Sequence, residues 1–160
     1  MADNMKDAFR NAGLDISNPR EKKKATQPKH EKDLENDVFQ DYTARAESVI
    51  KELKNNERQY RIFTTSKIRN ILAMVNEIYN DVQAERDEIL SENIQERILH
   101  LKVRLVYECG REEIIKKFYD KAGLEKMISD IGNSRKKFIA FARYMEALVA
   151  YHLFYGGSDR

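Results

Sequence analysis

From Leu34 to its C-terminal end, the chain places apolar residues three and four positions apart. This spacing puts them on one face of an α-helix, whose period is about 3.6 residues. The pattern predicts helices over residues 37–54, 65–87, 94–109, 111–122, 124–131 and 134–155. No stretch alternates apolar and polar residues as a half-buried strand does. We therefore predict an all-α fold, a compact bundle of about five to six helices.

Polar residues and glycines indicate where these helices begin and end. Ser, Thr and Asn side chains accept bonds from the free amides of a first turn, and glycine suits a C-terminal cap. The second helix is expected to begin near Thr65, and Asn93 with Glu96 forms a capping-box pattern for the third. The predicted ends are Asn55-Asn56, Gly110, Gly123, Gly132 and Gly156-Gly157.

Two of the predicted helices, 94–109 and 134–155, carry more apolar residues than one buried stripe needs. Residues 94–109 are apolar nearly all round, which predicts a central position in the bundle. The last helix combines Phe138, Phe141 and Phe154 with several tyrosines. Its apolar circumference exceeds what a monomer of this size is expected to bury, which indicates a partner.

The N-terminal segment, residues 1–35, differs from the rest of the chain. Both prolines, Pro19 and Pro28, lie in it, and its apolar residues are sparse. Such a segment buries too little apolar surface to offset the entropy lost on ordering. We predict a flexible tail over residues 1–35, with a short helix at Met5–Ala12, and one helical bundle domain over residues 36–160.

Composition narrows the class of protein further. The net charge is only +2, and no apolar run approaches the roughly 18–20 residues that span a membrane. The first residues lack the apolar core of a secretion signal. A single cysteine, Cys109, allows neither an intramolecular disulfide nor a cysteine-based zinc site. These features predict a cytoplasmic protein that has no contact with a membrane.

The candidate residues for catalysis are few and scattered. His30, His100 and His152 show no metal-binding spacing, and the chain has no glycine-rich phosphate loop. His152 lies on an apolar helix and is expected to be a satisfied histidine of the core or of an interface. Cys109 is expected to be a buried small thiol and not a nucleophile. We predict no enzyme activity, no cofactor and no metal site.

Charge is strongly segregated along the chain despite the small total. Residues 58–76, 97–107 and 131–145 contain basic residues and no acid, whereas residues 77–96 contain seven acids and the single base Arg86. Lys67 and Arg69 also lie in the first turns of their helix, where the dipole favours anions. Basic side chains beside free helix amides suit a phosphate, although a solvated surface explains them as well. With no base-reading motif present, the expected nucleic-acid contacts are to the backbone.

Four blocks of sequence resemble a known family. They are Thr64–Asn70 (TTSKIRN), Val75–Asn80 (VNEIYN), Leu101–Glu108 (LKVRLVYE) with Gly110-Arg111, and Phe141–Gly157 (FARYMEALVAYHLFYGG). In this order they resemble the small helical subunit of type III-A CRISPR effectors, the Csm complex. Together the blocks span Thr64–Gly157, whereas residues 1–55 show no resemblance.

The resemblance implies a non-catalytic subunit that is present in several copies. In such complexes the copies stack into a filament beside repeated backbone subunits, together with a large subunit, and support guide RNA paired to target RNA. The RNA-binding candidates are Lys67, Arg69, Lys102, Arg104, Arg135, Lys136, Lys137 and Arg143. Lys102 and Arg104 lie about 200° apart on a helix, so one of them is expected to serve structure or a protein interface. Arg143 pairing with Glu146 or with a neighbouring subunit is the alternative for that residue.

Two other functions fit the residues as well. One is a helical protein-interaction module whose charges serve contacts between helices and never meet RNA. The other is a stand-alone single-stranded RNA binder. Reversing the charges of Lys67 and Arg69 is expected to separate these possibilities. A subunit that supports RNA should lose RNA and still assemble, whereas an interaction module should lose assembly and keep its RNA affinity.

Overall fold

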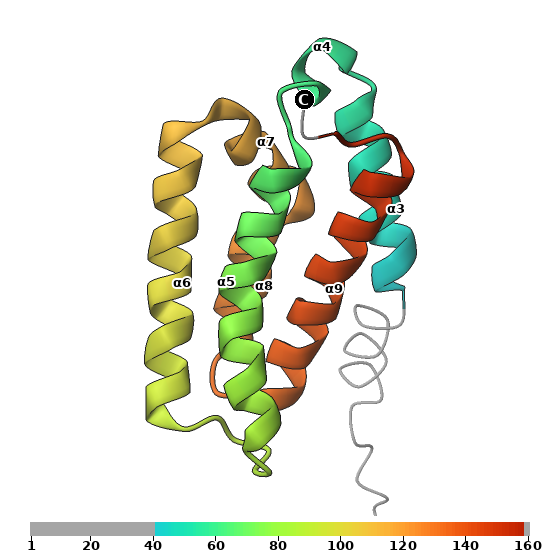
Figure 1. Ribbon diagram of the computed structural model, residues 1–160. Helices are drawn as coiled ribbons and strands as arrows, with labels where there is room; N and C mark the ends of the chain where they lie inside the picture. Colours follow the sequence, from blue (N-terminus) through green and yellow to red (C-terminus); the bar gives the residue numbers. More distant parts are fainter. Residues whose placement is uncertain (1–40, 159–160) are drawn as a thin grey trace, which may run out of the picture. The chain divides into compact units, whose positions relative to one another are not determined.

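The computed structural model describes residues 41–158, which are built from helices without a β-strand (Figure 1). The helices are α3 (Tyr42–Lys54), α4 (Glu57–Tyr60), α5 (Thr65–Ala84), α6 (Glu92–Arg111), α7 (Glu113–Ala122), α8 (Leu124–Ile131) and α9 (Arg135–Phe154). The predicted all-α class is confirmed. The predicted tail (residues 1–35), the helix at Met5–Ala12 and the first residues of the helix 37–54 lie outside the described residues.

Helix α9 occupies the centre of the described bundle. It packs against α3 on one side and α5 on the other, and α8 lies along its first half (Figure 1). Phe138, Phe141, Tyr144 and Leu148 are fully buried. Most of the apolar circumference of α9 is therefore used inside the bundle, because a helix with neighbours on several sides needs apolar residues around most of its circumference. Surplus apolar surface remains only at its C-terminal end, where Leu153 and Phe154 are exposed, and a partner for it stays a prediction.

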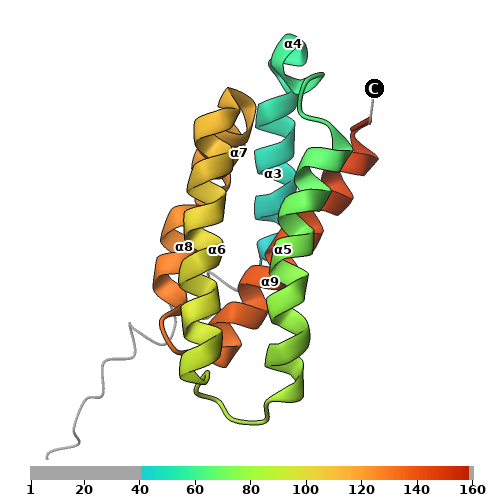
Figure 2. The same ribbon diagram turned by 60° about the vertical axis from the view of Figure 1, so that its left-hand side comes forward.

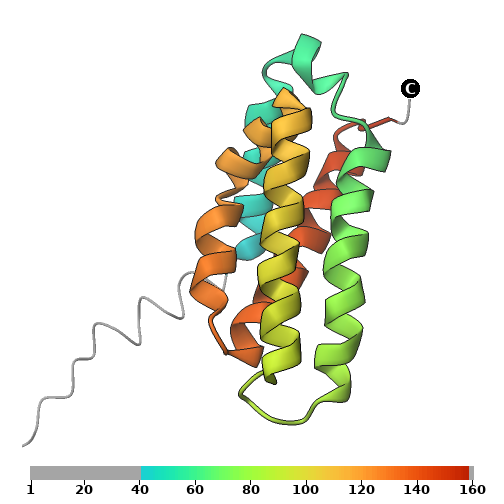
Figure 3. The same cartoon turned by 90° about the vertical axis from the view of Figure 1, so that its left-hand side faces the viewer.

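Helix α6 lies at the edge of the bundle instead. In Figure 1 its neighbours α5, α7 and α8 all lie to the right of it, and Figures 2 and 3 look towards its outer side, with α8 to the left and α5 to the right. Ile98 and Leu105 face those neighbours and are buried, whereas Leu99, Val103 and Tyr107 are 63–65% exposed. The prediction that this helix is central is wrong, because the apolar residues on its outer side have no counterpart among the residues that the structure describes.

Several helix ends differ from the predicted ones by a few residues. Helix α5 ends at Ala84 and not near residue 87, because Glu85 is already extended and begins the connection to α6. Helix α6 begins two residues earlier than predicted, and the Ser91 hydroxyl, not the Asn93–Glu96 pair, accepts the capping bond from Ile94 N. Gly110 does not break α6, since a single glycine costs a helix only about 1 kcal/mol.

The ends predicted from Gly123 and Gly132 are confirmed. Gly123 caps α7 in the left-handed conformation, with φ of 65°. The last carbonyl of α7, on Ala122, accepts bonds from Arg45 Nη2 and from the Tyr144 hydroxyl, both at 3.1 Å. The C-terminus of α7 is thereby tied to α3 and α9, which satisfies one of the carbonyls that a helix end leaves free.

An aromatic cluster joins the short helix α4, which the sequence pattern did not predict, to the C-terminal end of α9. The Tyr60 hydroxyl lies 2.9 Å from His152 Nδ1, and both residues are buried. Phe63 packs its ring against His152 and Phe118, with centroid distances of 4.8 and 5.0 Å. His152 is therefore a core residue with a polar partner, as the sequence predicted.

Candidate nucleic-acid interface

The first turns of α9 form one wall of an open cleft, which we call the α9 cleft. Its volume is about 550 Å³, and its lining includes Arg135, Lys136 and Arg143. The opposite wall comes from the connection between α5 and α6, because Arg135 N donates to the Glu88 carbonyl at 3.0 Å. The Arg135 Nε atom also donates to the Val82 carbonyl at 3.1 Å, which holds this side chain against the last turn of α5.

The α9 cleft carries a surplus of positive charge. Among the described residues that line it, Glu88 is the only acid, against the three cations. Lys136 and Arg143 are exposed, and neither forms an ion pair with another described residue. In particular, the considered pairing of Arg143 with Glu146 is not seen. The positive end of the α9 dipole adds to this field, so the cleft attracts anions.

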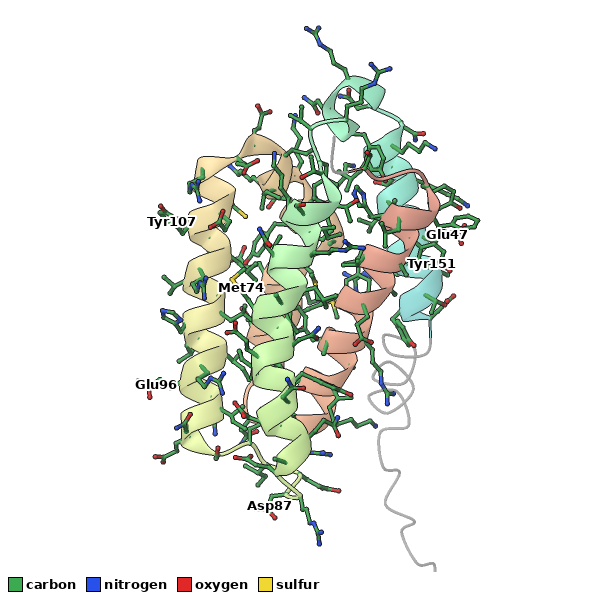
Figure 4. All side chains as sticks on the ribbon, in the orientation of Figure 1. Glu47, Met74, Asp87, Glu96, Tyr107 and Tyr151 are labelled. Atoms are coloured by element: carbon green, nitrogen blue, oxygen red, sulfur yellow. The ribbon has the colours of Figure 1, made fainter. Side chains whose placement is uncertain are left out.

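A second cleft of about 440 Å³ lies between α5 and α6, with Met74 on its α5 side (Figure 4). It brings together Lys67 and Arg104, two of the predicted RNA-contact residues, and adds Arg111. Two of the three cations that line this second cleft form ion pairs with acids of the same chain. Lys67 Nζ lies 2.5 Å from a Glu112 carboxylate oxygen, and Arg111 pairs with Glu108 at 3.4 Å. Among the lining residues only Arg104 is a cation without a described ion-pair partner.

The Lys67–Glu112 contact explains why a lysine is tolerated in the first turn of α5. Lys67 Nζ also donates to the Ile62 carbonyl at 2.9 Å. Its charge is therefore compensated by a carboxylate from the junction of α6 and α7. Reversing Lys67 removes this internal pair, so the Lys67–Arg69 double reversal no longer separates RNA contact from structural damage.

The remaining predicted residues lie apart from one another. Lys102 points towards α8, where its Nζ atom donates to Ser129 Oγ at 3.0 Å and approaches Glu125 at 3.9 Å. Lys102 thus has partners within the chain, which fits the expectation that one member of the Lys102–Arg104 pair serves structure. Arg69 is exposed on α5 and lines neither cleft. Lys137 is half-buried in the first turn of α9, next to the α9 cleft but outside its lining.

Sequence reasoning missed the residues that complete the α9 cleft from other elements. Tyr42 at the start of α3 and Ile89 in the α5–α6 connection both contribute apolar surface to it. Ile89 is 65% exposed and pairs through its backbone with Ser134. No periodicity predicts this contact, because it joins two connections that are 45 residues apart in the chain (134 minus 89).

The candidate residues for catalysis do not assemble into a site in the described part of the chain. Cys109 is half-buried, and burial raises the pKa of its thiol, which disfavours the reactive thiolate. No group of three or more His, Cys, Asp or Glu residues within residues 41–158 is placed to hold a metal ion. Nor is any helix in this range long and apolar enough to cross a membrane.

The fold and its clefts define a small all-helical protein with a cationic groove at the start of its central helix. A family model described as Csm2 Type III-A matches residues 36–158. The chain therefore belongs to the Csm2 family of type III-A CRISPR systems, and the resemblance seen in the sequence blocks is confirmed.

Individual relatives support this assignment over most of the chain, and each is named CRISPR system Cms protein Csm2. The relative from Enterococcus italicus is 36% identical over 116 residues, which cover 68% of this chain and 83% of that protein. The relative from Mycobacterium tuberculosis strain H37Rv is 33% identical over 123 residues, 77% of this chain and 98% of that protein. The Streptococcus thermophilus relative is 34% identical over 121 residues, 75% of this chain and 95% of that protein.

Proposed function

We propose that this chain, as the small subunit of a type III-A CRISPR complex, is a non-catalytic scaffold for RNA. Several copies form a filament beside the repeated backbone subunits and the large subunit. The filament supports the guide RNA while it is paired to target RNA. The contacts are to the phosphate backbone and therefore do not depend on the base sequence.

The observation that carries the RNA part of the proposal is the unmatched charge of the α9 cleft. Lys136 and Arg143 are exposed cations, and Arg135 completes the cluster at the N-terminus of a 20-residue helix. Cations and a positive helix end at one open groove suit a phosphate chain. Arg69 and Arg104 are further backbone contacts in this proposal, whereas Lys67 and Lys102 act first in internal pairs.

The test is a double charge reversal in the α9 cleft, Lys136→Glu with Arg143→Glu, made in the tagged chain and purified with its assembly from the host. The matched control is Lys116→Glu with Lys126→Glu, two exposed lysines outside the two clefts. We expect the cleft variant to keep its copy number in native mass spectrometry but to bind the guide–target RNA duplex more weakly. The slope of log affinity against log salt should fall by about 1.5, since each lost contact removes about 0.7–0.9.

Two other results would contradict the proposal, each in favour of one alternative. If the cleft variant fails to assemble while its RNA affinity stays normal, the charges serve protein contacts, and the chain is an interaction module. If the isolated wild-type chain binds single-stranded RNA as tightly as the whole assembly does, the chain is a stand-alone RNA binder.

A further inference from the structure

The surface that α9 contributes to the α9 cleft is apolar between two cations. After Arg135, the lining residues of this helix are, in chain order, Lys136, Ile139, Ala140 and Arg143. They share one face of α9, because the last three lie three, four and seven positions after the first. Lys136 and Arg143 are two turns apart, which separates them by about 10 Å along the helix axis. A ligand that fits this face has an apolar centre with negative charge on either side.

Two apolar side chains from other elements complete the centre of the cleft. Tyr42 is the first residue of α3, whose start lies beside α9 (Figure 1), and Ile89 belongs to the connection between α5 and α6. Tyr42 is half-buried and packs against the core, whereas Ile89 is 65% exposed. Apolar and aromatic walls with a few charged groups are typical of sites for small organic groups, and about 550 Å³ is an ordinary volume for such a site.

Backbone hydrogen bonds hold the wall that carries Ile89. Leu90 N donates to the Asn133 carbonyl at 2.8 Å, and Arg135 N donates to the Glu88 carbonyl at 3.0 Å. These two bonds lie on either side of Ile89 in the chain, so an exposed isoleucine is fixed beside the start of α9. Because this wall is already in place, a ligand that binds there loses little free energy in ordering it.

The first amides of α9 are partly occupied by groups of the chain itself. The Glu88 carbonyl accepts from Arg135 N, and the Ser134 hydroxyl accepts from Lys137 N at 3.4 Å. A phosphate at this cleft therefore meets the side chains of Lys136 and Arg143 and not a row of free amides. These are the two cations that lie on either side of the apolar centre.

We propose that the α9 cleft binds one unpaired nucleotide of an RNA strand. The base lies against Tyr42, Ile89 and Ile139. The two phosphates that flank the nucleotide lie at Lys136 and Arg143. A paired base is stacked within its duplex and cannot enter, so the nucleotide is single-stranded or turned out of the duplex. Stacking on an aromatic ring reads no sequence, since every base has an aromatic face.

This inference deepens the proposed function by naming the form of RNA that the cleft takes, and it rests on that proposal for RNA as the ligand. The two can fail separately, because they change different quantities. Losing a phosphate contact lowers the slope of log affinity against log salt. Losing the base contact lowers the affinity and leaves that slope unchanged, because no charge is removed.

The first experiment measures binding of the full chain to two single-stranded RNA probes of equal length, by fluorescence anisotropy at low salt. One probe is oligouridine, and the other carries abasic units with the same number of phosphates. We expect the abasic probe to bind about five- to tenfold more weakly, because it cannot stack. The salt slopes of the two probes should be equal.

Variants of the apolar centre should remove this preference for bases. Ile89→Ser and Tyr42→Leu should each reduce it to less than about twofold, because one shortens the wall and the other removes the aromatic ring. Tyr42→Phe keeps the ring and should behave like the wild type. Leu99→Ser is the matched control, since Leu99 is also 65% exposed but lies on α6, outside the two clefts. Circular dichroism checks folding, and the exposed Ile89 keeps the test valid if Tyr42→Leu does not fold.

The second experiment uses two RNA duplexes that differ only in one unpaired uridine, bulged from one strand. We expect the full chain to bind the bulged duplex about fivefold more tightly than the perfect duplex. Ile89→Ser should abolish the difference, whereas Leu99→Ser should preserve it. A bulge preference that both variants keep would come from the shape of the duplex and would contradict the inference.

Three results of the first experiment would overturn the inference. One is equal affinity for the two probes while Lys136→Glu with Arg143→Glu weakens both, which leaves the proposed function in place with a cleft for phosphates only. Another is a preference for bases that survives both Ile89→Ser and Tyr42→Leu, because the bases then bind elsewhere. The last is RNA affinity that the Lys136–Arg143 reversal does not change, which would contradict the proposed function as well.

Discussion

Helices α6 and α9 are both 20 residues long, and both carry apolar residues around much of their circumference. They differ in where that surface goes. Helix α9 buries it against α3, α5 and α8, so that even Tyr144 and His152 are fully enclosed. Helix α6 buries one side and leaves Leu99 and Val103 in solvent. Similar apolar richness therefore serves the core in one helix and an outward surface in the other.

The comparison shows why apolar content alone does not identify an interaction surface. A helix in the middle of a bundle contacts neighbours on several sides, whereas one at the edge contacts them on one side only. Surplus apolar residues become informative only after the neighbours of each helix are known. In this chain the longer exposed apolar surface is on α6, whereas α9 exposes apolar residues only at its C-terminal end, at Leu153 and Phe154.

The largest expected contrast comes from removing one apolar side chain from each helix. Phe141→Ala in α9 should lower the free energy of unfolding by about 3–5 kcal/mol, because it leaves a cavity in the core. Val103→Ala in α6 should change it by less than about 0.5 kcal/mol, because the side chain is exposed. Urea denaturation of dilute protein measures both values. Equal losses would mean that α6 is covered in the folded chain and that the contrast is wrong.

A smaller effect is expected at high pH, where Tyr60 of α4 meets the buried His152 of α9. Burial raises the pKa of the Tyr60 hydroxyl to about 12, above its ordinary value near 10. The neutral hydroxyl is favoured by folding, so this stability is fully present below about pH 10 and is lost as the pH rises towards about 12. The loss due to Tyr60 should reach about 2 kcal/mol.

Thermal melts between pH 9 and 12 test this expectation. Tyr60→Phe should flatten the fall in stability over that range. Tyr107→Phe, on the exposed side of α6, should follow the wild-type curve. A Tyr60→Phe curve parallel to the wild type would show that this hydroxyl titrates alike in the folded and unfolded chain.

The smallest expected contrast is between two glycines, Gly157 just after α9 and Gly110 in the last turn of α6. A methyl group on Gly157 would lie 2.3 Å from His152 Nε2, and His152 is fully buried and has little room to shift. Gly157→Ala should therefore cost about 1–2 kcal/mol. Gly110→Ala should instead stabilise the monomer by about 0.5–1 kcal/mol, since its surroundings are open and alanine favours a helix. Differential scanning calorimetry would reveal both shifts, and the same sign for both would contradict the contrast.

Much of this protein follows from its sequence. The all-α class, the helix ends at Gly123 and Gly132 and the core role of His152 are local consequences of periodicity and caps. The family follows from four blocks of residues, because a long ordered match is specific even where single motifs are not. The basic windows also follow directly from the residue order.

The tertiary structure decided which residues meet, because that depends on packing between elements distant in the chain. Only packing shows that Glu112 neutralises Lys67, and that Ser129 engages Lys102. The α9 cleft depends on the α5–α6 connection lying against the start of α9, which no local pattern encodes. The sequence pattern predicted α6 at the centre of the bundle, whereas α9 lies there, and this difference has the same cause. Periodicity states how much apolar surface a helix has, but only its neighbours determine how much of that surface is covered.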